Sequence, residues 1–573
     1  MIQSIKVEPS PSKLTLIPLG GQSELGQICW VFSYQGSYLL VDAGASYPVT
    51  ELPGVDLLLP NLSFLEANQD QIAGLVLTNA HEEHIGAASF LMKHLSIPRV
   101  LGPKFATTFL QHTLAQQGQS LGETKIEGIE LRQFYQVGPF ALEWIQVNDA
   151  IADASALHVL TKEGSILYTS SFKFDQTPVD DRLIDMARLS ELGDNGLLAL
   201  ISDSSGVESD GYTPSEKVVL PALKQHIKQA KGRVVVVVPG SNTHRLQLLF
   251  ELAQTLGRKI ILLGDTLIQT AIVAVMTGSL SYDRKVEASI DKIGFLKDHE
   301  ILVVATGHEG DPFDMLFDLA HNKNKELSLR AGDTVIYSAE VVPGRSRLMA
   351  NILDAFLANG IYAIEGKGVH VSKHASREEL KLMLSIARPK FFIPAMGEGR
   401  HVTSHAKLAK DWGQDQDTIL TLQNGQILEI SSDYAFSQAK VEAASVFYNR
   451  GLKEKVTTYS VNERRALSQE GVITIGCLVN DSGKLLDHIT IEGTGSGFLR
   501  SQDWLNLKSE LLEMIENIVR EHENPTLAKE NSEAYISGLR AAIRELVNKS
   551  IRSKLQAKPV IQVVIHKTTS PAV

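Results

Sequence analysis

Five consecutive valines, Val234–Val238, constrain the fold of this chain more than any other feature of the sequence. A run without polar residues gives a strand with no solvent-facing side, so we expect it inside a sheet that is covered on both faces. A helical segment at 216–231 precedes the run, and a polar turn at 240–245 leads into another helix. Further strands are expected at 259–263, 301–305 and 334–337. This alternation predicts a parallel sheet sandwiched by helices, in a domain that spans 213–358.

A second set of short aliphatic and β-branched runs lies on either side of this domain. Strands are expected at 14–19, 28–32, 38–41, 74–77, 142–147, 157–161, 166–169 and 197–202. After 358 the chain is expected to return to the same layers through 362–364, a helix at 377–387 and a strand at 390–394. We therefore predict that 1–212 and 359–432 form one α/β layered domain, which the parallel-sheet domain interrupts.

The last part of the chain is predicted to be a small separate module. Residues 433–465 are polar and show no hydrophobic periodicity, so we interpret them as a linker. Beyond them, strands are expected at 472–479, 489–492 and 560–566, with amphipathic helices at 504–520 and 532–555. This pattern predicts an α+β domain over 466–573. The apolar stripes of its helices either pack within the module or form an interface between subunits.

The composition limits the classes of protein to which the chain can belong. With 66 acidic and 55 basic residues the net charge is -11, which argues against binding of nucleic acid over the whole surface but allows a local basic groove. The two cysteines, Cys29 and Cys477, are far apart, so we expect neither a disulfide framework nor a cysteine-ligated metal. No segment has the apolar length of a signal peptide or a membrane span. We therefore expect a cytoplasmic protein without membrane contact.

A polar loop follows the expected strand at 74–77 and carries the residues most suited to chemistry. It reads Thr78-Asn79-Ala80-His81-Glu82-Glu83-His84-Ile85-Gly86. Imidazole and carboxylate groups within a few residues of each other are the donors that zinc and related metals use. The loop therefore predicts a metal site, or the remains of one, at the end of a buried strand.

Several other motifs occur in order along the chain. They include Gly20-Gly21, Asp42-Ala43-Gly44, Phe172-Lys173-Phe174-Asp175, Ser202-Asp203-Ser204, Ser241-Asn242-Thr243-His244-Arg245 and His370-Val371-Ser372-Lys373-His374-Ala375-Ser376. With these motifs the chain resembles ribonuclease J over essentially its whole length. The resemblance implies the fold class α/β, with a metallo-β-lactamase αββα sandwich, an inserted β-CASP parallel-sheet domain and a small C-terminal α+β domain.

The resemblance also implies a metal-dependent hydrolase in which two ions act on an RNA phosphodiester. Matched to the family motifs, the first ion corresponds to Asn79, His81 and Asp149, the second to Glu83, His84 and Met396, and the bridging carboxylate to Ser171. Only His81 and His84 keep the family's residue, so five of these seven positions are altered. Asp203, the acidic residue of the β-CASP motif, is retained.

The altered positions weaken the case for catalysis. Ser171 has no charge to offset the repulsion between two dications, Asn79 is a neutral amide, and the Met396 thioether suits copper(I) better than zinc. We therefore expect no functional two-metal centre and no catalytic residue in the ordinary sense, with Asp203 left without a metal-bound water to activate. At most, one weakly bound Zn or Mn is expected, at His81, Glu83, His84 and Asp149.

The positions that handle RNA in the family are better preserved. The resemblance implies phosphate or nucleotide contacts at Asn242, His244, Arg245, Ser372, Lys373, His374 and Ser376. Lys373 replaces a glycine of the family's turn, which adds a positive charge but removes a close backbone approach. The alternative for the first group is structural: Ser241 or Asn242 would cap the helix that follows.

These observations predict a ribonuclease J-like pseudoenzyme of RNA metabolism that binds RNA or serves as the partner subunit of an active ribonuclease. The resemblance implies a homo-oligomer or a hetero-oligomer. Two alternatives stay open. One is an active 5′-3′ exo- or endoribonuclease with an atypical mononuclear metal site, and the other is a scaffold or regulatory protein without an RNA role.

Overall fold

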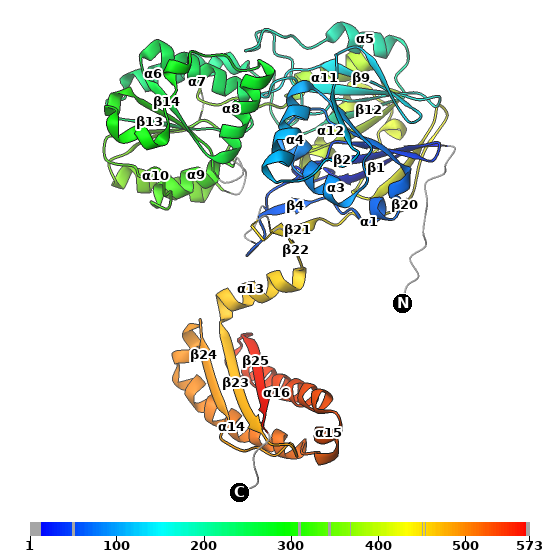
Figure 1. The fold of residues 1–573 in the computed structure, drawn as a ribbon. Coiled ribbons are helices and arrows are strands. Elements are labelled where there is room, and N and C mark those ends of the chain that lie inside the picture. Colours follow the sequence, from blue (N-terminus) through cyan, green and yellow to red (C-terminus); the bar gives the residue numbers. More distant parts are fainter. Residues whose placement is uncertain are drawn as a thin grey trace. The chain divides into compact units, whose positions relative to one another are not determined.

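The computed structural model describes residues 13–48, 52–307, 311–341, 345–366, 368–449, 451–452 and 454–568. The chain forms two compact units, of which the first contains Met1–Tyr47 and Leu58–Val446 and the second contains Pro48–Leu57 and Phe447–Val573. Figure 1 shows the elements of both. All the residues that the sequence singles out for chemistry lie in the first unit, so that unit decides what the site can do.

Two sheets form the layered part of the first unit. The larger has the strand order β20-β19-β1-β2-β3-β5-β6-β7, from β1 (Leu14–Gly20), β2 (Cys29–Tyr34), β3 (Ser37–Val41), β5 (Ile72–Val76), β6 (Arg99–Gly102), β7 (Lys125–Gly128), β19 (Gln426–Ile430) and β20 (Ala435–Lys440). The smaller has the order β18-β12-β11-β10-β9-β8, from β8 (Phe134–Val137), β9 (Phe140–Gln146), β10 (Ser155–Leu160), β11 (Ser165–Tyr168), β12 (Ala199–Asp203) and β18 (Phe391–Ala395). Both parts of the predicted two-part domain contribute strands to each sheet.

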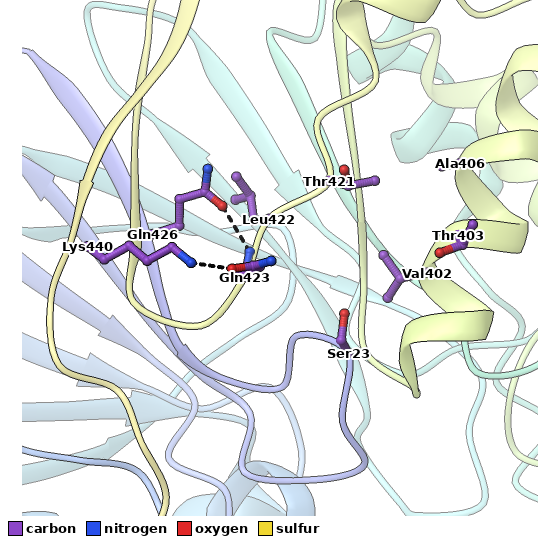
Figure 2. A pocket seen from close by; sticks show the side chains of 9 residues that line it. All are labelled: Ser23, Val402, Thr403, Ala406, Thr421, Leu422, Gln423, Gln426 and Lys440. Carbon is purple, nitrogen blue, oxygen red and sulfur yellow. Dashed lines mark hydrogen bonds between the residues drawn. The ribbon is translucent and has the colours of Figure 1, made fainter.

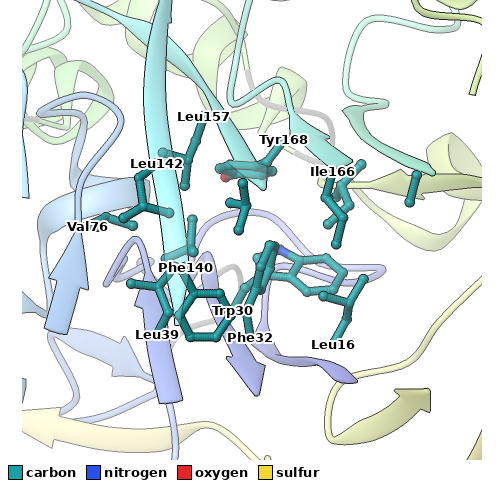
Figure 3. Close-up of a cluster of buried hydrophobic side chains, with 14 of the residues drawn as sticks. Leu16, Trp30, Phe32, Leu39, Val76, Phe140, Leu142, Leu157, Ile166 and Tyr168 are labelled. Carbon is teal, nitrogen blue, oxygen red and sulfur yellow. The ribbon is translucent and has the colours of Figure 1, made fainter. Parts of the chain in front are cut away.

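The inner faces of the two sheets share one apolar core, part of which Figure 3 shows. Trp30 and Phe32 from β2 lie in one cluster with Trp144 from β9 and Tyr168 from β11, and all four are buried. Helices cover the outer faces: α4 (Lys104–Gln116) packs on β6 and β7, and α12 (Gly399–Trp412) packs on β18. The other helices of these outer layers are α3 (Ala88–His94), α5 (Met186–Asp194) and α11 (Arg377–Ala387), and the short elements are β4 (Leu57–Leu59), α1 (Ser63–Glu66) and α2 (Glu82–Ile85). The predicted αββα layering is confirmed.

The valine run forms β13 (Val234–Val237), the central strand of a five-stranded sheet with the order β14-β15-β13-β16-β17. Its neighbours are β14 (Lys259–Leu263), β15 (Ile301–Ala305), β16 (Thr334–Tyr337) and β17 (Tyr362–Ile364), and every pairing is parallel. The helices of this part are α6 (Leu220–Gln229), α7 (Thr243–Leu256), α8 (Asp265–Thr277), α9 (Pro312–Ala320) and α10 (Ser346–Ala358). The prediction of a parallel sheet among helices is confirmed.

The predicted end of this sheet at residue 358 is too early. Tyr362–Ile364 was expected in the layered domain, but as β17 it pairs with β16 and forms the edge of the parallel sheet. An edge strand is partly exposed, as Tyr362 is here, and its short pattern does not indicate which sheet it joins.

The second unit contains a three-stranded sheet with the order β24-β23-β25 and two long helices. Strands β23 (Val472–Val479) and β25 (Val560–Lys567) are parallel, and β24 (Thr490–Thr494) pairs antiparallel with β23. Helices α14 (Gln502–Glu521) and α16 (Ser532–Leu555) bury their apolar stripes in the same core as the sheet, with α15 (Pro525–Glu530) between them. The predicted α+β module is present, and its helical stripes pack largely within it.

The segment interpreted as an irregular linker, 433–465, contains regular structure. It holds β20, β21 (Val446–Asn449), β22 (Glu454–Val456) and the first half of α13 (Thr458–Glu470). These strands are short and half-exposed, and α13 buries only Val461, so the sequence carries no strong hydrophobic period there. Among the described residues, no helix is both long and apolar enough to cross a lipid bilayer.

Candidate functional site

Asp42 organises the loop that follows β5. It stands directly after β3 with a positive φ of 57°, and its carboxylate accepts hydrogen bonds from Thr78 N at 2.9 Å and from the Tyr168 hydroxyl at 3.0 Å. The same carboxylate lies 2.7 Å from Nδ1 of His84. A fully buried acid with several donors fixes the orientation of each of them, so Asp42 sets the direction in which the His84 ring points.

His81, Asp149 and Ser171 form a closed hydrogen-bonded group. Nε2 of His81 is 2.6 Å from Oδ1 of Asp149, and the Ser171 hydroxyl donates to Oδ2 of Asp149 over 2.6 Å. Burial opposes the charge on Asp149, but the donors from His81 and Ser171 outweigh it and keep the pKa of Asp149 well below its ordinary value. An ionised carboxylate only accepts hydrogen bonds, so Nε2 of His81 carries the proton that it donates.

The other ring nitrogen of His81 contacts Ser241, which precedes α7. Nδ1 of His81 lies 2.7 Å from the Ser241 hydroxyl. Burial and the nearby charge of Lys373 lower the pKa of His81, against the opposing charge of Asp149. The ring is therefore neutral, and Ser241 donates to Nδ1. Both nitrogens of His81 are engaged within the protein.

Asn79 and Met396 also make contacts within the protein. The Asn79 amide donates to the Ser170 hydroxyl over 2.9 Å, and its carbonyl oxygen accepts from His81 N over 2.9 Å. Met396 belongs to the apolar core between the sheets, and its backbone N–H donates to the carbonyl of Gly21. Among the described residues, no group of three or more His, Cys, Asp or Glu side chains is arranged to hold a metal ion.

Lys373 and His374 extend from the turn before α11 to the acids of the site. Nζ of Lys373 lies 2.6 Å from Oε1 of Glu83, and Nδ1 of His374 lies 2.6 Å from Oδ2 of Asp203. Burial opposes ionisation of Glu83, but the positive charges of Lys373 and His374 hold the pKa of Glu83 well below the usual range. Burial also acts against the charge on His374, yet Asp203 raises the pKa of His374 above its ordinary value. Glu83 and Asp203 thus each face a cation.

Two buried polar residues, Lys173 and Thr213, donate hydrogen bonds to backbone carbonyls of the turn before α11. Lys173 donates to the carbonyl of Ser372 over 3.4 Å, and Thr213 donates to the carbonyl of His374 over 2.7 Å. Two of the turn's backbone donors are already used, because His374 N donates to Ser372 Oγ and Ser376 N donates to Glu379. The backbone cradle expected for a phosphate is therefore partly satisfied from within.

Asn242, His244 and Arg245, at the start of α7, all make contacts within the protein. Asn242 caps the helix by accepting from Arg245 N over 2.8 Å. The Arg245 side chain has no exposed surface, and its guanidinium pairs with Glu216 at 2.6 Å. His244 is buried, with Nε2 at 3.7 Å from Asp180. The helix-cap alternative applies to Asn242, while the RNA contacts of these residues stay a prediction.

A cavity of about 570 Å³ lies elsewhere in the first unit. Figure 2 shows its lining, which comes from the loop after β1, from α12 and from the segment around β19. Ser23, Thr403, Thr421, Gln423 and Lys440 give it a polar wall, and none of the predicted site residues contributes to it. The site is thus built from direct side-chain contacts and not around this cavity.

Sequence reasoning missed two partners in the site. The sequence offers Ser241 only as part of a motif and as a candidate helix cap, although it contacts His81, and it does not connect Glu216 with Arg245. Glu216 does carry a signal, since a buried acid in a helix-starting motif needs a cation and Arg245 belongs to the next motif. Ser241 carries none, because serine is common at helix starts.

Comparison with known proteins matches three segments of the chain to family models. Residues 231–356 match the ribonuclease J β-CASP domain, 459–568 the ribonuclease J C-terminal domain, and 24–168 the metallo-β-lactamase superfamily. The chain is 30% identical to Ribonuclease J of Synechocystis over 97% of its own length and 87% of that protein. It is 32% identical to Ribonuclease J of Helicobacter pylori over 83% of its length and 69% of that protein.

A solved structure shares the fold. The crystal structure of a protein of unknown function from Enterococcus faecalis superposes with a TM-score of 0.52 at 14% sequence identity, and the match covers 73% of this chain and 100% of that one. At this identity the likeness concerns the fold alone. The near-complete alignment with the first relative, together with the order of the three matched domains, establishes descent: the chain belongs to the ribonuclease J family.

Proposed function

We propose that this member of the ribonuclease J family binds RNA, or joins an active ribonuclease as a partner subunit, without hydrolysing RNA at a two-metal centre of its own. One observation carries the proposal. His81 donates from Nε2 to Asp149, and Asp149 accepts from Ser171 with its second oxygen. His81 and Asp149 correspond to metal ligands of the family, and Ser171 corresponds to its bridging acid. Here these three side chains are hydrogen-bonded to one another.

The donor set as a whole does not fit two divalent cations. A metal needs a lone pair on each ligand, and the Nε2 lone pair of His81 is absent when that atom carries a proton. Two neighbouring dications also need a shared anion, and Ser171 supplies a neutral hydroxyl. Met396 offers a soft sulfur within an apolar core. We therefore derive no hydrolytic step through a metal pair.

RNA binding is supported by family membership and by the chemistry of the turn before α11. The named relatives are ribonucleases, so RNA is the ligand class that this fold handles in them. Lys373 and His374 both carry positive charge in the turn, which suits the binding of a phosphate. Both cations are partly balanced by Glu83 and Asp203, so we expect moderate affinity that depends on salt.

A second candidate function has one specific observation in its favour. His84 donates from Nδ1 to Asp42, which leaves a lone pair on Nε2, and that buried atom has no hydrogen-bond partner among the described residues. Its nearest acid is Glu83, at 3.7 Å. This tautomer is the one that a metal accepts, so a single weakly held Zn or Mn at His84 and Glu83 is the alternative to a metal-free site.

The test combines metal analysis, cleavage and binding on the full chain. We expect untreated protein to contain well under one equivalent of Zn or Mn and to leave 5′-monophosphorylated single-stranded RNA intact in the presence of Mn²⁺. In fluorescence anisotropy the same RNA should bind, and binding should weaken steeply as salt is raised. His81→Ala serves as the matched control, because it removes the residue on which a family-type first metal site depends.

The other possible results of this test would support other functions. Near two equivalents of metal with cleavage that disappears in His81→Ala would contradict the proposal. One equivalent of metal with cleavage that disappears in His84→Ala would support the mononuclear alternative. A protein that neither cleaves RNA nor binds it in a salt-dependent way would instead be a scaffold or regulatory protein.

A further inference from the structure

Three carboxylates converge on the region that lies between the loop after β5 and the turn before α11. Asp149 and Asp203 are almost completely buried, and Glu83 is half-buried on the first turn of α2. Buried like charges repel each other and lose hydration, so a cluster of this kind is stable only with compensating positive charge. In a metal-dependent hydrolase the metal ions supply that charge.

The described residues around this cluster offer two cationic side chains. His374 pairs with Asp203 at 2.6 Å, and Lys373 pairs with Glu83 at 2.6 Å. Burial acts against the charge on Lys373, but its ion pair with Glu83 and the charges of Asp149 and Asp203 raise the pKa of Lys373, so all three acids favour its ammonium form. His81 uses one ring nitrogen for Asp149 and the other for Ser241, so it does not pair with Glu83 or Asp203. Lys373 is therefore the central positive charge of the cluster.

We infer that the ammonium group of Lys373 is a resident counter-ion that takes the place of the divalent cations and holds the carboxylates Glu83, Asp149 and Asp203 together. The inference rests on the proposed function, since a lysine can fill this role only where a metal pair does not. Lys373 stands at the position where the resemblance to ribonuclease J implies a glycine. A glycine has no side chain there, so the positive charge is specific to the lysine of this chain.

An ammonium group can replace the charge of a metal but not its chemistry. It has three N–H donors and no vacant orbital, so it neither coordinates a water nor lowers the pKa of one. It is also covalently attached and does not exchange with solvent. The site therefore keeps its packed geometry under conditions in which a metal-dependent relative loses its ions, such as treatment with a chelator.

The test compares thermal unfolding of the full-length protein and its Lys373→Met variant, each measured in EDTA and in Mn²⁺ at matched ionic strength. Methionine keeps the length of the side chain and removes the charge. We expect Lys373→Met to lower the Tm by several degrees in EDTA, and Mn²⁺ to recover much of that loss by entering the freed space. The wild-type Tm should not respond to Mn²⁺.

Two further variants separate charge from packing. Glu83→Gln in the Lys373→Met background removes one of the unpaired acids and should restore part of the Tm without metal. Lys381→Met is the matched control, because Lys381 pairs with Glu378 at 2.7 Å and its side chain is 22% exposed, against 21% for Lys373. That variant should change the Tm little and should not respond to Mn²⁺.

The inference is overturned if Lys373→Met unfolds at the wild-type Tm, or if its loss is recovered neither by Glu83→Gln nor by Mn²⁺. If Lys373→Met is insoluble, the double variant decides: a folded double variant supports the counter-ion role, and an insoluble one contradicts it. A different result would contradict the proposed function: two equivalents of metal in the untreated wild-type protein.

Discussion

Nε2 of His81 lies 2.6 Å from Oδ1 of Asp149, and this contact joins the loop after β5 to the loop after β9. The same carboxylate accepts from Ser171 Oγ over 2.6 Å and from the backbone N–H of Ala150. A single ionised acid is thus the acceptor for three donors from three parts of the sandwich. This arrangement makes Asp149 a structural anchor that joins these loops.

Placing an acid at Ser171 should destabilise the protein in the absence of metal. In Ser171→Asp a second carboxylate stands beside Oδ2 of Asp149 and replaces a donor with a repelling charge. We expect the free energy of unfolding to fall by about 3 kcal/mol in EDTA, as is usual for an uncompensated buried charge. Urea denaturation measures the change. Mn²⁺ should recover part of it, because a bridging acid is the group that two metals share.

Ser171→Asn is the control for that substitution. It has nearly the same shape as aspartate and no charge, and its amide can still donate to Asp149, so it should cost no more than about 1 kcal/mol and should not respond to Mn²⁺. If Ser171→Asp were as stable as the wild type in EDTA, Asp149 would have to be uncharged. The hydrogen bonds among His81, Asp149 and Ser171 would then need another assignment.

The contact between Ser241 and His81 should have a measurable role in stability. Ser241→Ala removes the donor to Nδ1 of His81 and leaves that buried nitrogen without a partner. We expect a loss of about 1–2 kcal/mol in the free energy of unfolding. Nitrogen NMR of the His81 ring should still show the proton on Nε2, because Asp149 holds it there. A proton found on Nδ1 of the wild-type ring would contradict the assigned hydrogen-bond directions.

The sequence predicts the layers of this fold well because the strands are strongly apolar. The valine run could only be buried, and β13 is fully buried in the centre of its sheet. Tyr362–Ile364 and the segment 433–465 were placed less well, since half-exposed edge strands have weak patterns. Which sheet an edge strand joins depends on contacts with strands far away in the sequence.

The contacts of the site were not predictable from the sequence. Matching motifs implies that Ser171 and Met396 stand at ligand positions of the family, and this assignment stays a prediction. It does not show that Lys373 reaches Glu83, because these residues are 290 positions apart and a turn does not reveal where its side chains point. Nor does it show that Arg245 is turned inward to Glu216. Such pairings depend on how the parallel sheet and the sandwich meet within the first unit.

Arg245 should contribute to stability far more than to RNA binding. Its guanidinium is fully buried and pairs with Glu216, while also donating to the carbonyl of Val369 over 2.9 Å. Arg245→Met leaves Glu216 charged and unpaired, so we expect a loss of about 3–5 kcal/mol in the free energy of unfolding. RNA affinity, measured by anisotropy on the folded fraction, should change by less than about twofold, or roughly 0.4 kcal/mol.

Arg377→Met provides the comparison for Arg245. Arg377 pairs with Asp210 at 2.9 Å on the surface, so its removal should cost less than about 1 kcal/mol. If Arg245→Met were folded and stable but bound RNA tenfold more weakly, the RNA contact implied by the family motif would be correct for Arg245, and its buried orientation would belong to the RNA-free state.

His405 should make the stability of the first unit depend on pH. Its ring is fully buried on α12, where Nδ1 contacts the Ser204 hydroxyl at 3.0 Å, and burial lowers its pKa to about 3 against the opposing charge of Asp203. In the unfolded chain the ring has its ordinary pKa of 6.5. Between these two values the unfolded state binds the extra proton, so stability falls as the pH is lowered from 6.5 towards 3.

Because one extra proton binds to the unfolded state, the free energy of unfolding should fall by about 1.4 kcal/mol for each pH unit once the pH is well below 6.5. Urea denaturation between pH 7 and pH 5 measures it before the carboxylates titrate. His405→Asn retains a polar group near the position of Nδ1 and cannot ionise, so its stability should change less over the same range. Equal slopes for the two proteins would mean that other groups carry the acid sensitivity and that His405 keeps an ordinary pKa when folded.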